Sequence, residues 1–143
     1  MDYYWDTPSR EIQKKAFQIL FALEKDPQNN NIDRLYDIVL EGKDFDDYLP
    51  RLVNGILGNK IDLDAQISEH LAAGWAIARI NKADLVILRL AIYELSQQLV
   101  PYKVAIDEAL ILAKTFADED DRKFVNGVLK NFAPKVEATD TKD

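Results

Sequence analysis

Two basic and two aromatic side chains near the start of the chain have the spacing of a nucleic-acid binding surface. On a helix that turns about 100° per residue they fall within about 60° of one another, and they are Arg10, Lys14, Phe17 and Phe21. Rings that face solvent can stack on bases while cations hold phosphates, as in proteins that bind single strands. A neighbouring helix or a second subunit could cover the same rings, so the residues alone leave both interpretations open.

A second basic and aromatic pair lies near the other end of the chain. The helix expected over about 121–132 places Lys123 on its outer side and Phe124 at the edge of its apolar stripe. That stripe consists of Val125, Val128, Leu129 and Phe132. A glycine inside a helix costs about 1 kcal/mol relative to alanine. We therefore expect a neighbouring helix to pack closely against Gly127.

Charge is distributed unevenly along the chain. The net charge of −7 would ordinarily count against a nucleic-acid ligand, because affinity for a polyanion comes from neutralised phosphates. Residues 9–25 nevertheless carry four basic and two acidic side chains, and residues 122–135 carry four basic and no acidic ones. The acidic residues gather at 26–50 and at 118–121. Local charge decides whether a polyanion can dock, so both basic segments remain candidates.

The composition excludes several kinds of chemistry. The chain has no cysteine and a single histidine, His70, so it cannot form disulfides, thiolate metal sites or a histidine-based metal site. The adjacent acids Asp107 and Glu108 diverge by about 100° on a helix and do not form an acid–base pair. We therefore expect a protein that is not an enzyme and that uses neither a metal nor a cofactor.

The length and hydropathy indicate one ordinary soluble domain. Of the 143 residues, 48% are hydrophobic and 30% are charged. No apolar run is long enough to span a membrane, and the first residues lack the basic and apolar regions of a signal peptide. We therefore expect a cytoplasmic protein with no membrane partner.

Apolar residues recur at intervals of three and four, which predicts an all-helical protein. We expect one domain over 9–133 with about seven helices, and flexible segments at 1–8 and 134–143. The expected helices span about 9–25, 33–40, 48–57, 61–73, 84–98, 101–116 and 121–132. Ser9 is the expected N-cap of the first helix, and Gly74 is the expected stop of the fourth.

The helix expected over 84–98 is apolar in nearly every direction around its axis. Such a helix is enclosed by its neighbours, so we expect it to lie at the centre of the fold. Arg89 lies within this run, and a buried guanidinium needs an acidic partner. Glu94 and Glu108 are the nearest candidates, and a structural ion pair is favoured over a catalytic role.

Several motifs follow one another along the chain. They are Ala-Phe-Gln-Ile-Leu at 16–20, Leu-Val-Asn-Gly-Ile at 52–56, Ile-Leu-Arg-Leu-Ala-Ile-Tyr-Glu-Leu at 87–95, Val-Pro-Tyr-Lys-Val-Ala-Ile-Asp-Glu-Ala at 100–109 and Lys-Phe-Val-Asn-Gly-Val-Leu at 123–129. In these motifs and their order the chain closely resembles the NusB family of bacterial transcription antitermination factors, over about residues 9–133. The resemblance implies a NusB-like RNA-binding fold of two packed helical halves.

The resemblance also implies a function. Members of the family act with NusE, a small-subunit ribosomal protein, to bind the boxA element of nascent RNA. The complex works with other Nus factors on the RNA polymerase elongation complex and helps it to read through terminators. This role is most prominent in the transcription of ribosomal RNA operons.

Site residues of the family can be carried over by position. RNA is contacted there at the start of the first helix, one turn further along, and by the Lys-Phe-Val-Asn-Gly motif. The matching residues here are Arg10, Phe21, Lys123 and Phe124, with Lys14 on the same face. The partner surface uses the central helix and the acidic loop before the last helix. The matching candidates are Asp84, Tyr93, Glu94 and Asp120.

One departure from the family affects the expected affinity. Family members commonly carry more arginines at the start of the first helix, whereas Arg10 here has Ser9 and Glu11 beside it. Fewer phosphate contacts predict weaker and less salt-sensitive RNA binding by the isolated protein.

Two other functions compete with this interpretation. The main alternative is a helical scaffold that ignores RNA and forms a homodimer through Phe17 and Phe21. A NusB-like domain of an RNA cytosine methyltransferase would be followed by a catalytic domain with a glycine-rich nucleotide turn. We do not expect that architecture, because the sequence contains no such turn.

Overall fold

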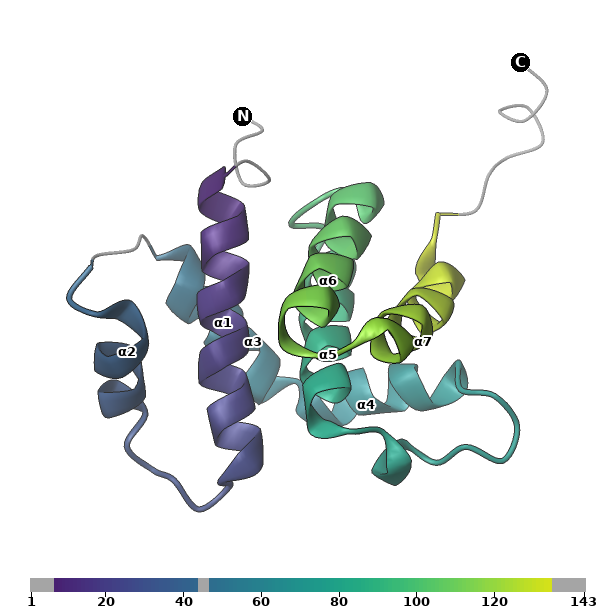
Figure 1. Ribbon diagram of the computed structural model, residues 1–143, viewed down its shortest axis with the longest axis horizontal. Coiled ribbons are helices and arrows are strands. Elements are labelled where there is room, and N and C mark those ends of the chain that lie inside the picture. The colour runs from purple at the N-terminus through teal and green to yellow at the C-terminus, as the bar shows by residue number, and fades with distance from the viewer. Residues whose placement is uncertain (1–6, 44–46, 135–143) are drawn as a thin grey trace.

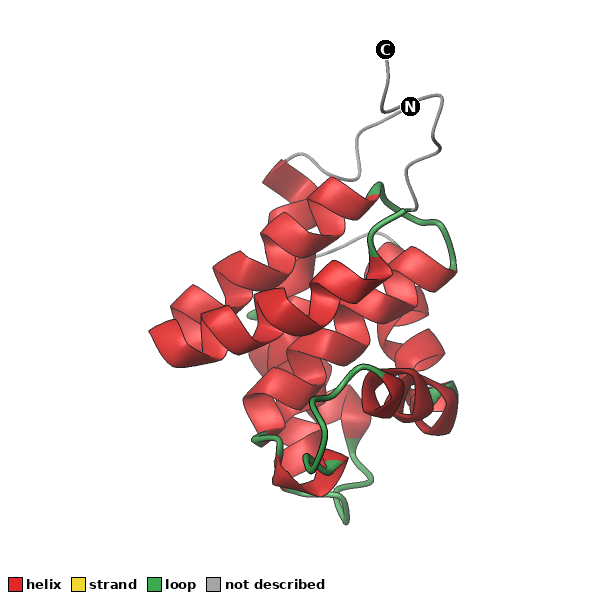
Figure 2. Ribbon diagram, turned by 90° about the vertical axis from the view of Figure 1, so that its right-hand side faces the viewer, coloured by secondary structure: helices red, strands yellow, loops and turns green. Residues whose placement is uncertain are grey.

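The computed structural model describes residues 7–43 and 47–134, and every regular element among them is a helix (Figure 1 and Figure 2). The α-helices are α1 (Thr7–Lys25), α2 (Ile32–Leu40), α3 (Tyr48–Gly58), α4 (Lys60–Glu69), α5 (Lys82–Ser96), α6 (Tyr102–Phe116) and α7 (Glu119–Leu129). Two 3₁₀ turns, η1 (Ile77–Arg79) and η2 (Lys130–Phe132), precede α5 and follow α7. The predicted fold class is confirmed. The segments expected to be flexible, 1–8 and 134–143, lie almost entirely outside the described residues.

The helices form two packed halves, with α1 to α3 on one side and α4 to α7 on the other (Figure 1). α5 joins the two halves, because it packs against α1 and α3 of the first half and against α4, α6 and α7 of its own. Nearly every α5 residue from Asp84 to Glu94 is buried, so the prediction of an enclosed central helix is confirmed. Across the described residues, no helix has the length and apolarity needed to cross a membrane.

Two predicted helix boundaries were wrong. α1 begins at Thr7, so Ser9 lies inside the helix and is not its N-cap. Pro8 permits this start because the first turn of a helix leaves its N–H groups unpaired. α4 ends at Glu69 instead of near Ala73. The residues from Ala72 to Ala76 are exposed, so no packing supports a further turn.

Arg89 joins α5 to two other helices. Its Nε and Nη2 donate to the two carboxylate oxygens of Asp64 on α4, at 2.7 and 2.8 Å. Its Nη1 donates to Glu24 on α1 at 2.8 Å. The structural ion pair is as expected, but the predicted partners Glu94 and Glu108 were wrong. Those carboxylates are nearer along the chain, whereas Asp64 and Glu24 come from elements that fold back against α5.

Glu94 and Glu108 belong to a separate polar layer between α5, α1 and α6. Glu94 is 1% exposed and accepts hydrogen bonds from Gln13 Nε2 and Tyr48 Oη, both at 2.6 Å. Glu108 on α6 accepts from Arg10 Nε at 3.3 Å. Burial raises the pKa of Glu94 to about 7 despite these two donors, and burial also raises the pKa of Glu108.

Replacing Arg89 should strongly destabilise the fold. Arg89→Ala leaves Asp64 and Glu24 facing each other without their shared cation and opens a gap beside α5, at a cost of about 3 kcal/mol in unfolding free energy. Lys60→Ala is the matched control, because Lys60 lies 3.9 Å from the same Glu24 but is 43% exposed. We expect the control to change stability by less than about 1 kcal/mol. Urea unfolding of both variants measures the difference, and equal stabilities would contradict the structural role of Arg89.

Glu94 should make the protein less stable as the pH rises. A carboxyl whose pKa is about 7 when folded and 4.5 when unfolded holds a proton that the unfolded chain releases. Its contribution is therefore complete below pH 4.5 and is lost as the pH rises through about 7, a change of about 3 kcal/mol. Glu94→Gln should flatten the profile, whereas the exposed Glu69→Gln should leave it unchanged. Parallel profiles for Glu94→Gln and the parent protein would show that the pKa of Glu94 is the same in the folded and the unfolded chain, and would contradict this prediction.

Candidate nucleic-acid interface

Four side chains of α1 were predicted to face outward, namely Arg10, Lys14, Phe17 and Phe21, and one of them is buried. Lys14 is exposed and Phe21 is partly exposed, as predicted. Phe17 is 1% exposed, so the prediction that its ring faces outward was wrong. Its ring is stacked between Phe21, at 5.2 Å between centroids, and Phe116 at the end of α6, at 4.6 Å. Phe116 was missed by the sequence analysis because helical periodicity gives no information on which neighbour covers a face.

The three cations near this aromatic stack, Arg10, Lys14 and Lys25, differ in the groups that they contact. Lys25 Nζ lies over the partly exposed Phe21 ring, 4.6 Å from its centre, so a cation and an aromatic ring occur together at this surface. Arg10 pairs with the buried Glu108, yet its side chain remains 60% exposed. Lys14 forms no ion pair with any described residue and is free to meet a phosphate.

The α7 face also presents basic side chains. Lys123 and Lys130 are exposed, while Val125, Val128 and Leu129 are buried, as the predicted stripe required. Gly127 lies on the exposed side, and a Cβ there would have no heavy atom within 4 Å. The predicted close packing of a helix against Gly127 was therefore wrong. The open backbone lies between two lysines, where a ligand can approach it.

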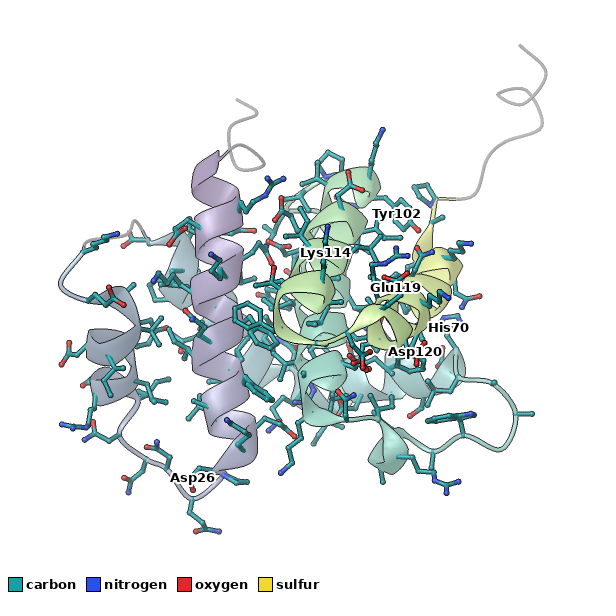
Figure 3. All side chains as sticks on the ribbon, in the orientation of Figure 1. Asp26, His70, Tyr102, Lys114, Glu119 and Asp120 are labelled. Atoms are coloured by element: carbon teal, nitrogen blue, oxygen red, sulfur yellow. The ribbon has the colours of Figure 1, made fainter. Side chains whose placement is uncertain are left out.

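α6 completes one continuous face between α1 and α7. It packs against both helices, and in Figure 1 the three lie side by side. The exposed Lys114 of α6 projects from this face between the other two helices (Figure 3). We call Arg10, Lys14, Phe21, Lys114, Lys123 and Phe124 the basic face. Lys114 was not among the predicted residues, because only the folded chain places it between the two basic segments.

Acidic residues border this face where α7 and α5 begin. Asp118 caps α7 by accepting from the Asp121 N–H at 2.9 Å, and the Asp121 carboxylate accepts from the Asp118 N–H at 3.2 Å. The N-cap of α5, Asn81, donates to Asp121 at 2.8 Å and accepts from the Asp84 N–H. Burial, together with Asp121, raises the pKa of Asp84 to about 8. Asp120 remains exposed beside them.

The predicted partner residues do not lie together. Asp84 and Asp120 share the acidic border. Tyr93 lies on another side of α5, where a Cβ at Gly55 would overlap its hydroxyl group. Glu94 is 1% exposed and is held by Gln13 and Tyr48. The prediction that Glu94 contacts a partner was therefore wrong, because this side chain is used to hold the fold together.

The similarity of the chain to known proteins extends over nearly all of its described residues. The model of the NusB family matches residues 10–134. The chain belongs to the NusB family. A transcription antitermination protein NusB of Levilactobacillus brevis is 48% identical over 125 residues, which cover 83% of this chain and 87% of the relative. The NusB of Listeria innocua is 40% identical over 127 residues, covering 88% of this chain and 96% of that protein.

Solved NusB structures share the fold. The NusB of T. maritima matches with a TM-score of 0.77 and 29% identity, over 96% of this chain and 99% of that one. A structure of the antitermination factors NusB and NusE in complex with double-stranded RNA contains a chain that matches with a TM-score of 0.75 and 26% identity. This match covers 87% of the present chain and 94% of the other. The NusB fold is thus shared by a chain crystallised together with RNA.

Phe17 and Phe21 should respond oppositely to replacement by alanine. Phe17→Ala opens a cavity in the core and should cost about 3 to 5 kcal/mol in stability. Phe21→Ala removes a partly exposed ring and should reduce stability much less, while lowering RNA affinity by about 1 to 3 kcal/mol if a base stacks there. Thermal unfolding and fluorescence anisotropy with a boxA RNA measure the two effects. Full RNA affinity in Phe21→Ala would remove Phe21 from the interface.

Proposed function

We propose that the protein is a transcription antitermination factor that binds the boxA element of nascent RNA together with NusE. In this role it promotes readthrough by RNA polymerase, notably in ribosomal RNA operons. The single observation that carries the proposal is the shared fold with a NusB chain solved in complex with NusE and double-stranded RNA. Such a factor acts where transcription occurs, which places it in the cytoplasm.

The basic face supports RNA binding by its chemistry. Lys14, Lys114 and Lys123 are exposed cations on three adjacent helices, so one strand can meet all three phosphate-binding groups. Phe21 and Phe124 are partly exposed rings beside them, suited to stacking on bases. The four acidic residues at 118–121 lie next to Lys123 and oppose phosphate binding. Unaided affinity should therefore be modest.

A protein partner at the acidic border would remove this repulsion. Cations of NusE placed near Asp84 and Asp120 would neutralise carboxylates and add phosphate-binding groups of their own. NusE and the RNA then each increase the affinity of the protein for the other by the same factor, because binding linkage is reciprocal. The residues therefore favour a two-protein unit that binds RNA cooperatively.

The competing scaffold interpretation has lost its main support. It required Phe17 and Phe21 to form an exposed apolar stripe through which two copies dimerise. Phe17 is instead covered by Phe116 of the same chain, so only Phe21 remains partly exposed.

A gel shift of boxA RNA tests the proposal with this protein alone, with NusE alone and with both. We expect the mixture to shift the RNA at concentrations at least about fivefold lower than either protein alone. Lys123→Gln should weaken the complex and reduce the salt slope by about 1, because one phosphate contact is lost. Lys43→Gln, an exposed lysine outside the basic face, is the matched control. A mixture no more effective than the better single protein would contradict the proposal.

A further inference from the structure

The aromatic ring of Phe21 has a neighbour on each of its two faces. Phe17, four residues earlier on α1, is stacked with it at 5.2 Å between the ring centroids and 22° between the planes. Lys25, four residues later, places its Nζ over the ring, 4.6 Å from the centroid. Residues four apart on a helix are neighbours along one face, so the two partners approach Phe21 from opposite directions along the axis. A base can therefore stack on Phe21 only where the Lys25 ammonium now lies.

The two neighbours of Phe21 are not equally firmly held. Phe17 is 1% exposed, and its other face is closed by Phe116 of α6, at 4.6 Å between centroids. Lys25 is exposed and is the last residue of α1. The contact between an exposed ammonium and a ring is weaker than the stacking of a base on an aromatic side chain. A base can therefore displace Lys25 from the ring, whereas Phe17 stays in place beneath it.

The Lys25 ammonium has no carboxylate to return to once it leaves the ring. On the same helix, Lys15 Nζ lies 3.7 Å from a carboxylate oxygen of Glu11. The carboxylate next to Lys25 in the sequence, Glu24, bonds to Arg89 at 2.8 Å. No ion pair joins Lys25 to any carboxylate in the part of the chain that the structure describes. Its positive charge is therefore available to a phosphate.

Lys25 also lies on the outer side of α1, together with the residues of the basic face. At 100° per residue, Lys14, Phe21 and Lys25 fall within about 40° of one another around the axis. A rise of about 1.5 Å per residue puts Lys25 about 16 Å beyond Lys14, at the end of α1 that Asp26 follows (Figure 3). Phe21 lies between the two lysines. A strand that runs along α1 with one base on Phe21 thus has phosphates on both sides of that base, each near a lysine.

We propose that Lys25 is a further RNA-binding residue that exchanges partners on binding. A base takes its place on the Phe21 ring, and the released ammonium binds the phosphate on the side of that base away from Lys14. The inference rests on the proposed function and extends the RNA-binding surface by one turn of α1. The exchange gives up one contact between a cation and a ring, and it gains one stacked base and one neutralised phosphate.

Side-chain NMR of the isotope-labelled protein follows this exchange directly. A ring current shifts the protons of a group that lies over the ring upfield. The ε-methylene protons of Lys25 should therefore resonate upfield of those of the exposed Lys43 in the free protein, and Phe21→Leu should abolish the difference. We expect saturating boxA RNA, added together with NusE, to remove the upfield shift of Lys25. No upfield shift in the free protein, or one that persists in the RNA complex, would overturn the proposal.

Charge variants of Lys25 measure the phosphate contact. Lys25→Gln should weaken the binding of boxA RNA about threefold and reduce the salt slope by about 1, because one phosphate contact is lost. Lys25→Arg keeps the positive charge and should retain both the affinity and the slope. Lys43→Gln makes the same change in net charge outside the basic face and is the matched control. An unchanged salt slope in Lys25→Gln would overturn the proposal, and so would tighter binding, which would show that the ammonium only blocks the ring.

These measurements separate the role of Lys25 from the proposed function. If the parent protein binds boxA RNA with NusE but Lys25→Gln behaves like Lys43→Gln, the inference fails and the proposed function stands. If the parent protein does not bind the RNA with or without NusE, the proposed function fails and the role of Lys25 fails with it.

Discussion

The fold depends on a central helix that is enclosed by five others and yet buries three ionisable side chains, of which Arg89 and Glu94 bond to α1. Arg89 reaches Glu24 of α1 and Asp64 of α4, and Glu94 reaches Gln13 of α1 and Tyr48 of α3. The hydrophobic effect has no preferred direction, so hydrophobic burial alone would let α1 slide or rotate on the apolar α5. The polar contacts of Gln13 and Glu24, at two different points along α1, remove that freedom. We infer that they set the rotation at which α1 presents its outer face.

That rotation determines which groups reach solvent. With Gln13, Phe17 and Glu24 turned inward, Lys14 and Phe21 lie at the surface beside α6. α6 in turn carries Lys114, and α7 adds Lys123 next to it. Cations that are far apart in the sequence thus form one face on a protein whose net charge is −7. The acidic residues at the starts of α5 and α7 form the neighbouring border, so the two surfaces meet at Phe124.

Much of the fold could be predicted from the sequence, because hydrophobic periodicity reports directly on which side of a helix is buried. The seven helices, the enclosed α5 and the core stripe of α7 followed from it. Apart from two helix boundaries, the errors concern contacts between elements. Phe17 has the helical angle of an outer residue, but the end of α6 places Phe116 over it. Arg89 was paired with carboxylates near it along the chain, while its partners come from α1 and α4. Tertiary packing supplied information that periodicity does not contain.

The predictions for the glycines and for the candidate site also failed where they depended on contacts between helices. Gly127 was expected to allow close packing, but it faces open space, whereas Gly55 is the glycine that a neighbouring side chain, Tyr93, contacts. Family resemblance identified residues on the basic face, yet it also included Glu94, which is buried. Lys114 carried no motif signal, since its place on the basic face depends on helices that meet only after folding. Spacing along one helix is therefore informative, and spacing between helices is not.

The central claim is that the packing around α5 creates a basic face for RNA and a separate acidic border for a protein partner. Chemical-shift mapping of the isotope-labelled protein, first with boxA RNA and then with NusE, tests this claim most directly. The account predicts that RNA shifts the amides around Lys14, Phe21, Lys114 and Lys123, and that NusE shifts those around Asp84 and Asp120. Shifts concentrated on α2 and α3 with either ligand, or the same set of residues for both, would contradict it.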